Sequence, residues 1–366
     1  MTTHLVWLSA AVITVTASCM AETVAQPLYS AEHLLNGPLV RRISDTAGLH
    51  VHIIYKPTNF CNAFSANITP VVSINAGDTV ETETIDAMGR DRDGIRRHVG
   101  GNPLTGPFFV RNSKPGDVLK ITLIKVALNR DYAYTSESFV SRSMPDTIAS
   151  RFRRPHLVKW KFDERRQSAR PDSSTTPYPH LSGYSIPLHP FVGCIGVAPA
   201  NRKNEKLSFF QGNFGGNMDF EMVAQGAIVF VPVLHDGAYF FIGDGHAEQG
   251  DGEIAGNALE TSLDVTFTID VIREQALQWP RVEYLEHIFA IGAAATLDKA
   301  VKIATSNLLS WLQATYSMSA EEATQVMSTA IEYKIAEIAD PDVIVVASID
   351  KRLLGRIAPV KPGPTY

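Results

Sequence analysis

Residues 227–256 read AIVFVPVLHDGAYFFIGDGHAEQGDGEIAG, and the fold is most easily worked out from this stretch. Two unbroken apolar runs, 227–234 and 238–243, flank a His-Asp-Gly turn, so the sequence predicts a β-hairpin. Strands without polar alternation are typically buried on both faces. The glycine-rich loop that follows is therefore expected to start from a rigid core element.

That loop concentrates groups that bind metal ions. Asp244, His246, Asp251 and Glu253 lie among five glycines. Because glycine has no Cβ, such a segment can fold back and direct several side chains at one point. Carboxylates and imidazoles are the usual ligands of divalent cations. The alternative is a turn-rich loop whose acids face water, since Asp-Gly is a common turn dipeptide.

The composition is that of an ordinary globular protein. The chain has 366 residues, 45% of them hydrophobic and 19% charged, with a net charge of −5, which suits one large or two medium domains. The mild acidity argues against a nucleic-acid partner. Three cysteines, Cys19, Cys61 and Cys194, exclude a disulfide-rich scaffold, although Cys61 and Cys194 could pair in an exported protein.

The N-terminus predicts export. Residues 5–17, LVWLSAAVITVTA, form an apolar run that is too short for a membrane span and suits a signal peptide over 1–21, cleaved after Ala21. A lipid anchor at Cys19 is the alternative. No later stretch predicts a membrane helix, so we expect a periplasmic or secreted protein without a permanent span.

Most of the chain predicts antiparallel β-structure, with helix only near the end. A Lys-Pro-Gly-Asp turn between 108–112 and 118–128 predicts a second hairpin. Residues 130–185 form an irregular insertion over the surface, which could cover an active site. The chain thus divides into a β-rich catalytic region, 22–280, and a C-terminal α/β element, 281–366. Further strands are expected at 51–55, 71–74, 79–86, 189–199 and 262–272, helices at 296–316 and 319–330, and closing strands at 334–338 and 342–349.

Five motifs then occur in a fixed order. They are Gly77-Asp78-x-Val80 with Glu83-Thr84-x-Asp86, Asn102-Pro-x-Thr105-Gly106-Pro107, His189-Pro190-x3-Cys194-Ile-Gly196-Val197-Ala198-Pro199, Gly215-Gly216-Asn217-Met218-Asp219, and Gly243-Asp244-Gly245-His246-Ala-x-Gln-Gly250-Asp251-Gly252-Glu253. From about Pro70 to Leu354 the series resembles the acetamidase/formamidase family. The resemblance implies a metal-associated hydrolase of short linear amides that forms homo-oligomers. It also implies two β-sandwich-like units of antiparallel strands with a small C-terminal α/β element.

Amide hydrolysis requires an activated nucleophile, a polarised carbonyl and a proton for the leaving nitrogen. A divalent metal, zinc rather than calcium, could supply the first two. We therefore take His246, Asp244 and Asp251 as candidate metal ligands, with Asp86 as a further one. Glu253 is the candidate general base and then acid, and Glu83 is its alternative.

Four other residues could line the substrate pocket: Asn102, Thr105, Asn217 and Asp219. Each also lies in a turn-forming sequence, which is the structural alternative. Cys194 lies between apolar residues and is interpreted as a buried, inert thiol. The sequence has no Gly-x-Ser-x-Gly elbow, Rossmann pattern or P-loop, which argues against serine catalysis and nucleotide cofactors.

Two other functions are compatible with these residues. The acidic glycine loop could bind structural calcium in a non-catalytic exported β-protein. The basic insertion at 151–170 could instead meet a larger or anionic amide, or a cyclic imide. The charged run at 90–98, the insertion and the export signal depart from many family members, and they bear on the substrate more than on the chemistry.

Overall fold

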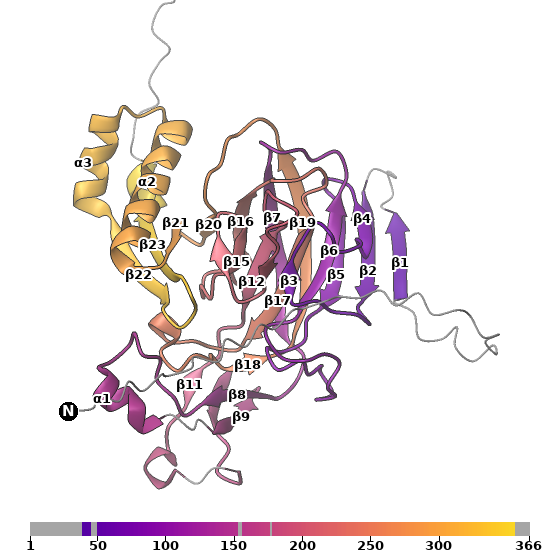
Figure 1. Cartoon of the computed structure of the whole chain (residues 1–366), viewed down its shortest axis with the longest axis vertical. Helices are drawn as coiled ribbons and strands as arrows, with labels where there is room; N and C mark the ends of the chain where they lie inside the picture. The colour runs from indigo at the N-terminus through magenta and orange to yellow at the C-terminus, as the bar shows by residue number, and fades with distance from the viewer. Residues whose placement is uncertain (1–38, 45–49, 153–155, 176–177, 356–366) are drawn as a thin grey trace, which may run out of the picture. The chain divides into compact units, whose positions relative to one another are not determined.

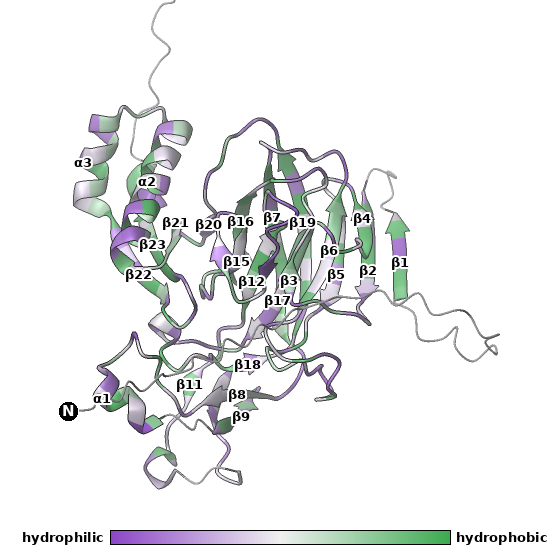
Figure 2. Ribbon diagram, in the orientation of Figure 1, coloured by the Kyte–Doolittle hydropathy of each residue, from purple (hydrophilic) through white to green (hydrophobic). Residues whose placement is uncertain are grey.

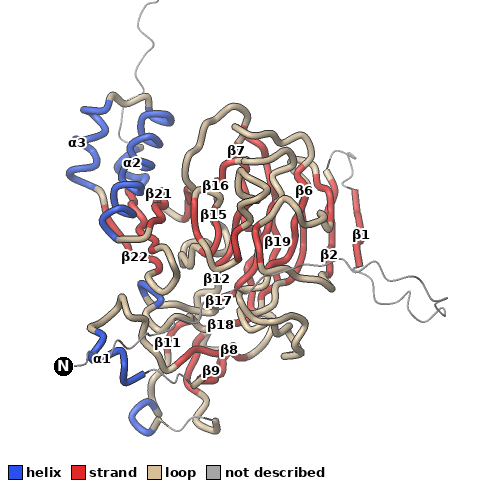
Figure 3. The backbone as a smooth tube through the Cα atoms, viewed as in Figure 1, coloured by secondary structure: helices blue, strands red, loops and turns tan. Residues whose placement is uncertain are grey.

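The computed structural model of the chain describes residues 39–44, 50–152, 156–175 and 178–355. The predicted signal peptide, 1–21, and Cys19 lie outside the described residues. None of the described helices is long and apolar enough to cross a bilayer. Figure 1 shows the chain with its elements labelled, and Figure 3 shows how strongly strands dominate it.

The first large sheet has ten strands in the order β1-β2-β5-β19-β7-β16-β20-β21-β23-β22. All neighbours are antiparallel except β2 and β5, which run parallel. The strands are β1 (Leu39–Ser44), β2 (Val51–Lys56), β5 (Thr79–Glu83), β7 (Val118–Leu128), β16 (Ile228–Pro232), β19 (Leu263–Ile272), β20 (Arg281–Tyr284), β21 (His287–Ala294), β22 (Glu332–Glu337) and β23 (Val343–Asp350).

The second large sheet has eleven strands and carries the candidate site. Its main order is β11-β10-β9-β8-β18-β17-β12-β15-β14, with β6 on β17 and β4 on β6. The strands are β4 (Val72–Ile74), β6 (Leu104–Val110), β8 (Tyr132–Ser136), β9 (Leu157–Asp163), β10 (Ser168–Pro171), β11 (Ile186–Pro187), β12 (Phe191–Val197), β14 (Gln211–Gly212), β15 (Gly215–Asn217), β17 (Phe240–His246) and β18 (Glu260–Thr261). A separate pair consists of β3 (Ala63–Phe64) and β13 (Lys206–Leu207).

The two sheets share one hydrophobic core. Residues alternate between buried and partly exposed along β19, so one face of the strand is covered. Phe267 of that face meets Phe108 of β6 at 5.5 Å and Phe240 of β17 at 5.2 Å between ring centroids, both edge-on. β12 contributes Ile195 and β17 contributes Phe240 and Ile242 to this core, and Figure 2 shows green, hydrophobic stretches along the strands around β19. Edge-to-face aromatic packing of this kind stabilises a core beyond simple area burial.

The helices belong to the C-terminal part. α2 (Leu297–Tyr316) and α3 (Ala320–Ala330) were expected at these positions, and they pack with β21 and β23 around a second apolar cluster. The capping box predicted at Ser319 and Glu322 is confirmed, because each residue's side chain accepts the backbone N–H of the other. Short helical turns are α1 (Asp146–Ala149), η2 (Ser150–Phe152), η3 (Pro179–Leu181), η4 (Asp251–Glu253) and α4 (Lys351–Leu354).

The mainly antiparallel β-fold with a small C-terminal α/β element is confirmed. However, the element is not a separate layer, because β20 pairs with β16 and so continues the first sheet. The insertion is also more regular than predicted. Strands β8, β9, β10 and β11 pair successively and extend the second sheet.

Both predicted hairpins are wrong. β16 pairs with β7 and β20 in the first sheet, whereas β17 pairs with β12, β6 and β18 in the second. Ala238 and Tyr239, with φ of +57° and +55°, turn the chain from one sheet to the other. The runs around 114–117 behave likewise, since β6 and β7 also lie in different sheets. The two unbroken apolar runs, 227–234 and 238–243, therefore lie on either side of a corner between two sheets and do not form a hairpin.

Candidate metal centre

Two of the central side chains lie at the C-terminal end of strand β17. Asp244 and His246 alternate with Gly243 and Gly245 at the end of this strand. A Cβ on Gly243 would come within 2.7 Å of the Pro103 carbonyl oxygen, and one on Gly245 within 2.6 Å of the Leu263 side chain. The glycines therefore allow neighbouring backbone and side chains to approach closely, while the residues between them point into the site.

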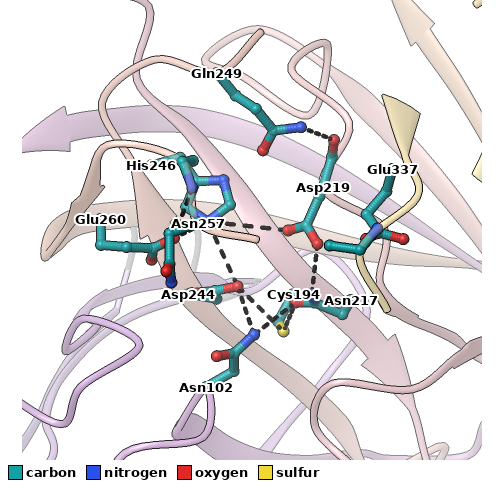
Figure 4. A network of polar contacts seen from close by, with 12 residues as sticks. Asn102, Cys194, Asn217, Asp219, Asp244, His246, Gln249, Asn257, Glu260 and Glu337 are labelled. Atoms are coloured by element: carbon teal, nitrogen blue, oxygen red, sulfur yellow. Dashed lines mark hydrogen bonds and ion pairs between the residues drawn. The ribbon is translucent and has the colours of Figure 1, made fainter. Parts of the chain in front are cut away.

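His246 lies at the centre of a buried acidic cluster, shown in Figure 4. Its Nε2 atom is 3.4 Å from Glu260 Oε1, 3.6 Å from Asp244 Oδ2 and 3.9 Å from Asp219 Oδ1. Glu253 also belongs to this cluster. One potential ligand atom from each of His246, Glu253 and Glu260 lies within 4.8 Å of the other two. Asp219 is fully buried, and Asp244 and His246 are 1% exposed.

The protonation of this cluster reflects its burial. Burial raises the pKa of Asp219, Glu253 and Glu260 above the ordinary range, and the neighbouring carboxylates add to the effect. Burial alone would lower the pKa of His246, but Glu260 and Asp244 raise it well above its ordinary value. Four acids around one imidazole leave an excess of negative charge, which either protons or a cation must balance.

Several polar atoms in the cluster lack a hydrogen-bond partner within the described chain. They are Asp219 Oδ1, Asp244 Oδ1, Glu260 Oε2 and both ring nitrogens of His246. Buried polar atoms are rarely left without a partner in folded proteins. One imidazole nitrogen together with carboxylate oxygens is a donor set that fits zinc or a similar divalent ion. The residues present thus fit the metal that the sequence led us to expect.

Two asparagines fix the carboxylates. Asn102 Nδ2 donates to Asp244 Oδ2 at 3.0 Å and to Asn217 Oδ1 at 3.2 Å. Asn217 Nδ2 in turn donates to Asp219 Oδ2. The thiol of Cys194 donates to Asn217 Oδ1 and to the Ser208 carbonyl, so Cys194 does not form a disulfide. Burial, followed by the charges of Asp244 and Asp219, raises the pKa of this thiol well above its usual range, consistent with an inert cysteine.

Gly193 opens the space in which the cluster forms. It lies in the middle of β12, next to β15 and β17. A Cβ at this position would be 2.5 Å from Asp219 Oδ1, 2.9 Å from Asp244 Oδ2 and 3.0 Å from His246 Cε1. Any side chain at this position would occupy the volume between the three groups.

Six of the ten predicted site residues meet here: Asn102, Asn217, Asp219, Asp244, His246 and Glu253. Both asparagines contact the acids. The roles proposed for all ten residues stay predictions.

The other four residues lie elsewhere. The Asp251 side chain is 64% exposed and pairs with Lys334 at 3.0 Å. Asp86 is fully buried in an ion pair of 2.7 Å with Arg130. The Glu83 carboxylate lies 3.6 Å from an Arg92 nitrogen, and the buried Thr105 hydroxyl donates to the Glu83 carbonyl. Each of these four side chains thus has a partner outside the cluster.

Sequence reasoning did not identify Glu260, Gly193, Glu337 or Asp340. Glu260 reaches His246 because β18 pairs with β17, with these two residues opposite each other. Glu337 and Asp340 lie close to Asp219, within 4.8 Å between ligand atoms. A glycine inside an apolar strand is a sign of close approach, so Gly193 could have been found. The isolated acids carry no comparable signal.

Part of the insertion contacts the site loop. The backbone N–H of Val140 donates to the Ile254 carbonyl at 2.9 Å, and Ser136 Oγ donates to the Ala255 carbonyl at 3.0 Å. Both acceptors follow Glu253 directly. The end of β8 and the segment after it therefore hold the loop that carries Glu253, and the insertion contacts this loop through Ser136 and Val140.

Comparison with known proteins identifies the relatives of this chain. Residues 49–208 and 211–353 match the family model of the Acetamidase/Formamidase family, which covers most of the chain. The chain belongs to the Acetamidase/Formamidase family. The resemblance inferred from the five motifs is thus confirmed, and the matched segments contain every residue of the buried cluster.

Individual relatives agree. A protein of Schizosaccharomyces pombe, named as a candidate formamidase, is 25% identical over an alignment of 284 residues, and the match covers 60% of this chain and 65% of that protein. The structure of a predicted acetamidase/formamidase from Thermoanaerobacter tengcongensis has a TM-score of 0.73 at 26% identity, covering 84% of this chain and 98% of the relative. An acetamidase structure from Yersinia enterocolitica has a TM-score of 0.68 at 28% identity, covering 81% and 89%.

Proposed function

We propose that the protein is a metal-dependent hydrolase of short linear amides such as formamide and acetamide, releasing ammonia and a carboxylate. Family membership supports amide hydrolysis. The observation that carries the metal dependence is the convergence of Asp219, Asp244 and His246, several of whose buried polar atoms lack a hydrogen-bond partner in the described chain.

In this proposal Asp219, Asp244 and His246 would hold the cation, and the Glu260 carboxylate would lie beside it, 3.4 Å from the same Nε2 atom of His246 that faces Asp219 and Asp244. When bound, a divalent ion polarises the amide carbonyl and increases the acidity of water. Zinc fits better than calcium because an imidazole belongs to the donor set.

Glu253 transfers the proton. Its carboxyl lies in the same cluster as His246, and burial raises its pKa well above the ordinary range. As its carboxylate, Glu253 accepts a proton from the attacking water while the water oxygen bonds to the carbonyl carbon. As its neutral acid, it returns that proton to the nitrogen as the C–N bond breaks. The products are an amine or ammonia and a carboxylic acid.

The closed surroundings favour a small substrate. His246 and Asp244 are 1% exposed, and Ser136 and Val140 hold the loop that carries Glu253. The basic residues of the insertion are partly neutralised elsewhere, for example Lys161 by Asp172 at 3.1 Å. We therefore favour formamide-sized and acetamide-sized substrates over a larger anionic amide.

Two further properties are proposed on grounds other than the site. The apolar run at 5–17 supports export to the periplasm or the medium. Likeness to the family supports a homo-oligomer. Size-exclusion chromatography with light scattering and cell fractionation would measure these two properties.

Asp244 and Asp251, both of which the sequence predicted as metal ligands, provide the test. Asp244→Asn alters the buried cluster, whereas Asp251→Asn alters an exposed acid of the same loop. We expect Asp244→Asn to lower ammonia release from formamide by at least about a hundredfold and Asp251→Asn to leave it within about twofold. His246→Ala should inactivate, with the exposed His180→Ala as its control. Full activity in folded Asp244→Asn and His246→Ala proteins would refute the assigned site.

A further inference from the structure

A pocket at the C-terminal element contains an arginine, Arg281, that forms no ion pair with the described residues. The pocket is lined by residues of β16, β20 and α2, has a volume of about 300 Å³, and shares no residue with the buried acidic cluster. Its apolar wall consists mainly of Val118, Phe230, Ile272, Leu277 and Trp311. Small-molecule sites typically combine such a wall with a few fixed polar groups.

Asn307 holds the Arg281 guanidinium in place. The Arg281 Nε atom donates to the Asn307 side-chain oxygen at 2.8 Å, and Nη2 donates to the Asn307 backbone carbonyl at 3.2 Å. Asn307 is itself fixed, because its Nδ2 atom donates to the Pro280 and Ile291 carbonyls. The guanidinium carbon also lies 5.1 Å from the centre of the Trp311 ring, within cation–π range. The cation is therefore positioned before any ligand binds.

Most of the donors of this guanidinium are still available. Of its five N–H groups, two donate to Asn307, so three have no acceptor in the described part of the chain. Two of the three are on Nη1, which makes no hydrogen bond and is nevertheless not a buried atom, so a ligand can reach it. Together Nη1 and Nη2 offer the parallel pair of N–H groups that binds both oxygens of a carboxylate.

The charge of Arg281 is not balanced inside the pocket. The acid that lines the pocket, Glu283, pairs instead with Lys351 at 3.9 Å. Burial lowers the pKa of Arg281 to about 10, and no carboxylate of the described residues opposes this effect. The guanidinium is still charged at neutral pH, and a partly buried cation without an anion is unfavourable. An anionic ligand would remove this cost.

We propose that the pocket binds a small organic monocarboxylate, whose carboxylate pairs with Arg281 and whose apolar body packs against Phe230 and Trp311. One cation among apolar walls suits a monoanion with a hydrophobic group better than a phosphate, which needs more donors and more positive charge. The ligand joins α2 to the loop before β20, which also lines the pocket. The site does not depend on amide hydrolysis, because it has no residue in common with the acidic cluster.

Isothermal titration calorimetry of the full chain with phenylacetate tests the proposal. We expect a dissociation constant of about 1 mM or lower. Acetate, which lacks the apolar body, and 2-phenylethanol, which lacks the carboxylate, should each bind at least about tenfold more weakly. Arg281→Gln removes the guanidinium, and Ala314→Phe fills the pocket from an exposed position of α2. Each variant should weaken phenylacetate binding at least about tenfold.

Two substitutions on α2 are matched controls. Lys302→Gln removes an exposed cation that does not line this pocket, and Gln313→Phe adds a ring next to position 314 but outside the pocket. Both variants should bind phenylacetate as the wild type does. Asp244→Asn should bind it too, which distinguishes this pocket from the acidic cluster.

Circular dichroism establishes that each protein is folded. Ala314→Phe leaves Arg281 and its contacts with Asn307 in place, so it decides the question if Arg281→Gln does not fold. The proposal is overturned if phenylacetate does not bind, if folded Ala314→Phe binds it as tightly as the wild type, or if only Asp244→Asn loses it.

Discussion

A methyl group at position 193 should disable the proposed metal centre without unfolding the protein. In Gly193→Ala the new Cβ would lie 2.5 Å from Asp219 Oδ1, whereas an ordinary contact begins at 3.4 Å, so this oxygen must withdraw by about 0.9 Å (3.4 minus 2.5). Asp244 Oδ2 and His246 Cε1, at 2.9 and 3.0 Å, must move as well. Three ligand-bearing groups are thus displaced by one substitution.

A displacement of about 1 Å in a reacting group costs on the order of a hundredfold in rate, or about 2.7 kcal/mol. Overpacking should also lower the free energy of unfolding by about 1–3 kcal/mol. We therefore expect kcat/KM for formamide to fall about a hundredfold, together with a loss of bound zinc measured by mass spectrometry.

Gly250→Ala is the matched control. Gly250 lies in the loop that carries Glu253, has a φ of −83°, and a Cβ there would meet nothing within 4 Å. This variant should retain activity and metal. The reasoning would be refuted if folded Gly193→Ala kept the zinc content and kcat/KM of the wild type.

Three more substitutions test other contacts. Asn102→Ala removes the amide that holds Asp244 at 3.0 Å, and metal affinity from competition with a chelator should fall about 10- to 100-fold; unchanged affinity would exclude this positioning role. Arg130→Ala leaves the buried Asp86 carboxylate without its cation, so chemical denaturation should show a loss of about 3–5 kcal/mol, and a loss below 1 kcal/mol would contradict the pairing. Burial alone would raise the pKa of Asp117, but hydrogen bonds from backbone N–H groups and a guanidinium lower it. The ionised Asp117 therefore stabilises the folded protein above about pH 4, and this stabilisation is lost as the pH falls through the lower pKa of the folded state. Asp117→Asn should therefore destabilise at pH 7 and hardly at pH 2, as thermal melts would show, and an equal loss at both pH values would contradict the reasoning.

The local sequence pattern was sufficient to predict the two site residues that come from a single strand, Asp244 and His246 of β17. The glycine-rich segment predicted that Asp244 and His246 lie together, but as part of a loop folded back on itself; the structure instead places both at the end of β17, on one side of the strand. The same pattern could not separate Glu253 from Asp251. Glu253 turns inward at a φ of +47°, after Gly252 at +81°, while Asp251 faces Lys334, and these directions depend on packing against β22.

The other site residues could not be predicted, because they reach the site through pairing between strands that are distant in sequence. Glu260 joins the site only because its strand pairs with β17, and Glu337 only because β22 is at the end of the first sheet, near β15. The apolar runs on either side of His235 predicted two strands correctly. Their assignment as a hairpin failed because burial on both faces is equally satisfied when the two strands lie in opposite sheets.

An anomalous-scattering map from crystals of the zinc-loaded protein tests the central claim most directly. We predict one peak about 2.0–2.2 Å from a ring nitrogen of His246 and from carboxylate oxygens of Asp219 and Asp244. A peak located instead at Asp251 or Asp86, or an active protein with no peak among His246, Asp219 and Asp244, would contradict it.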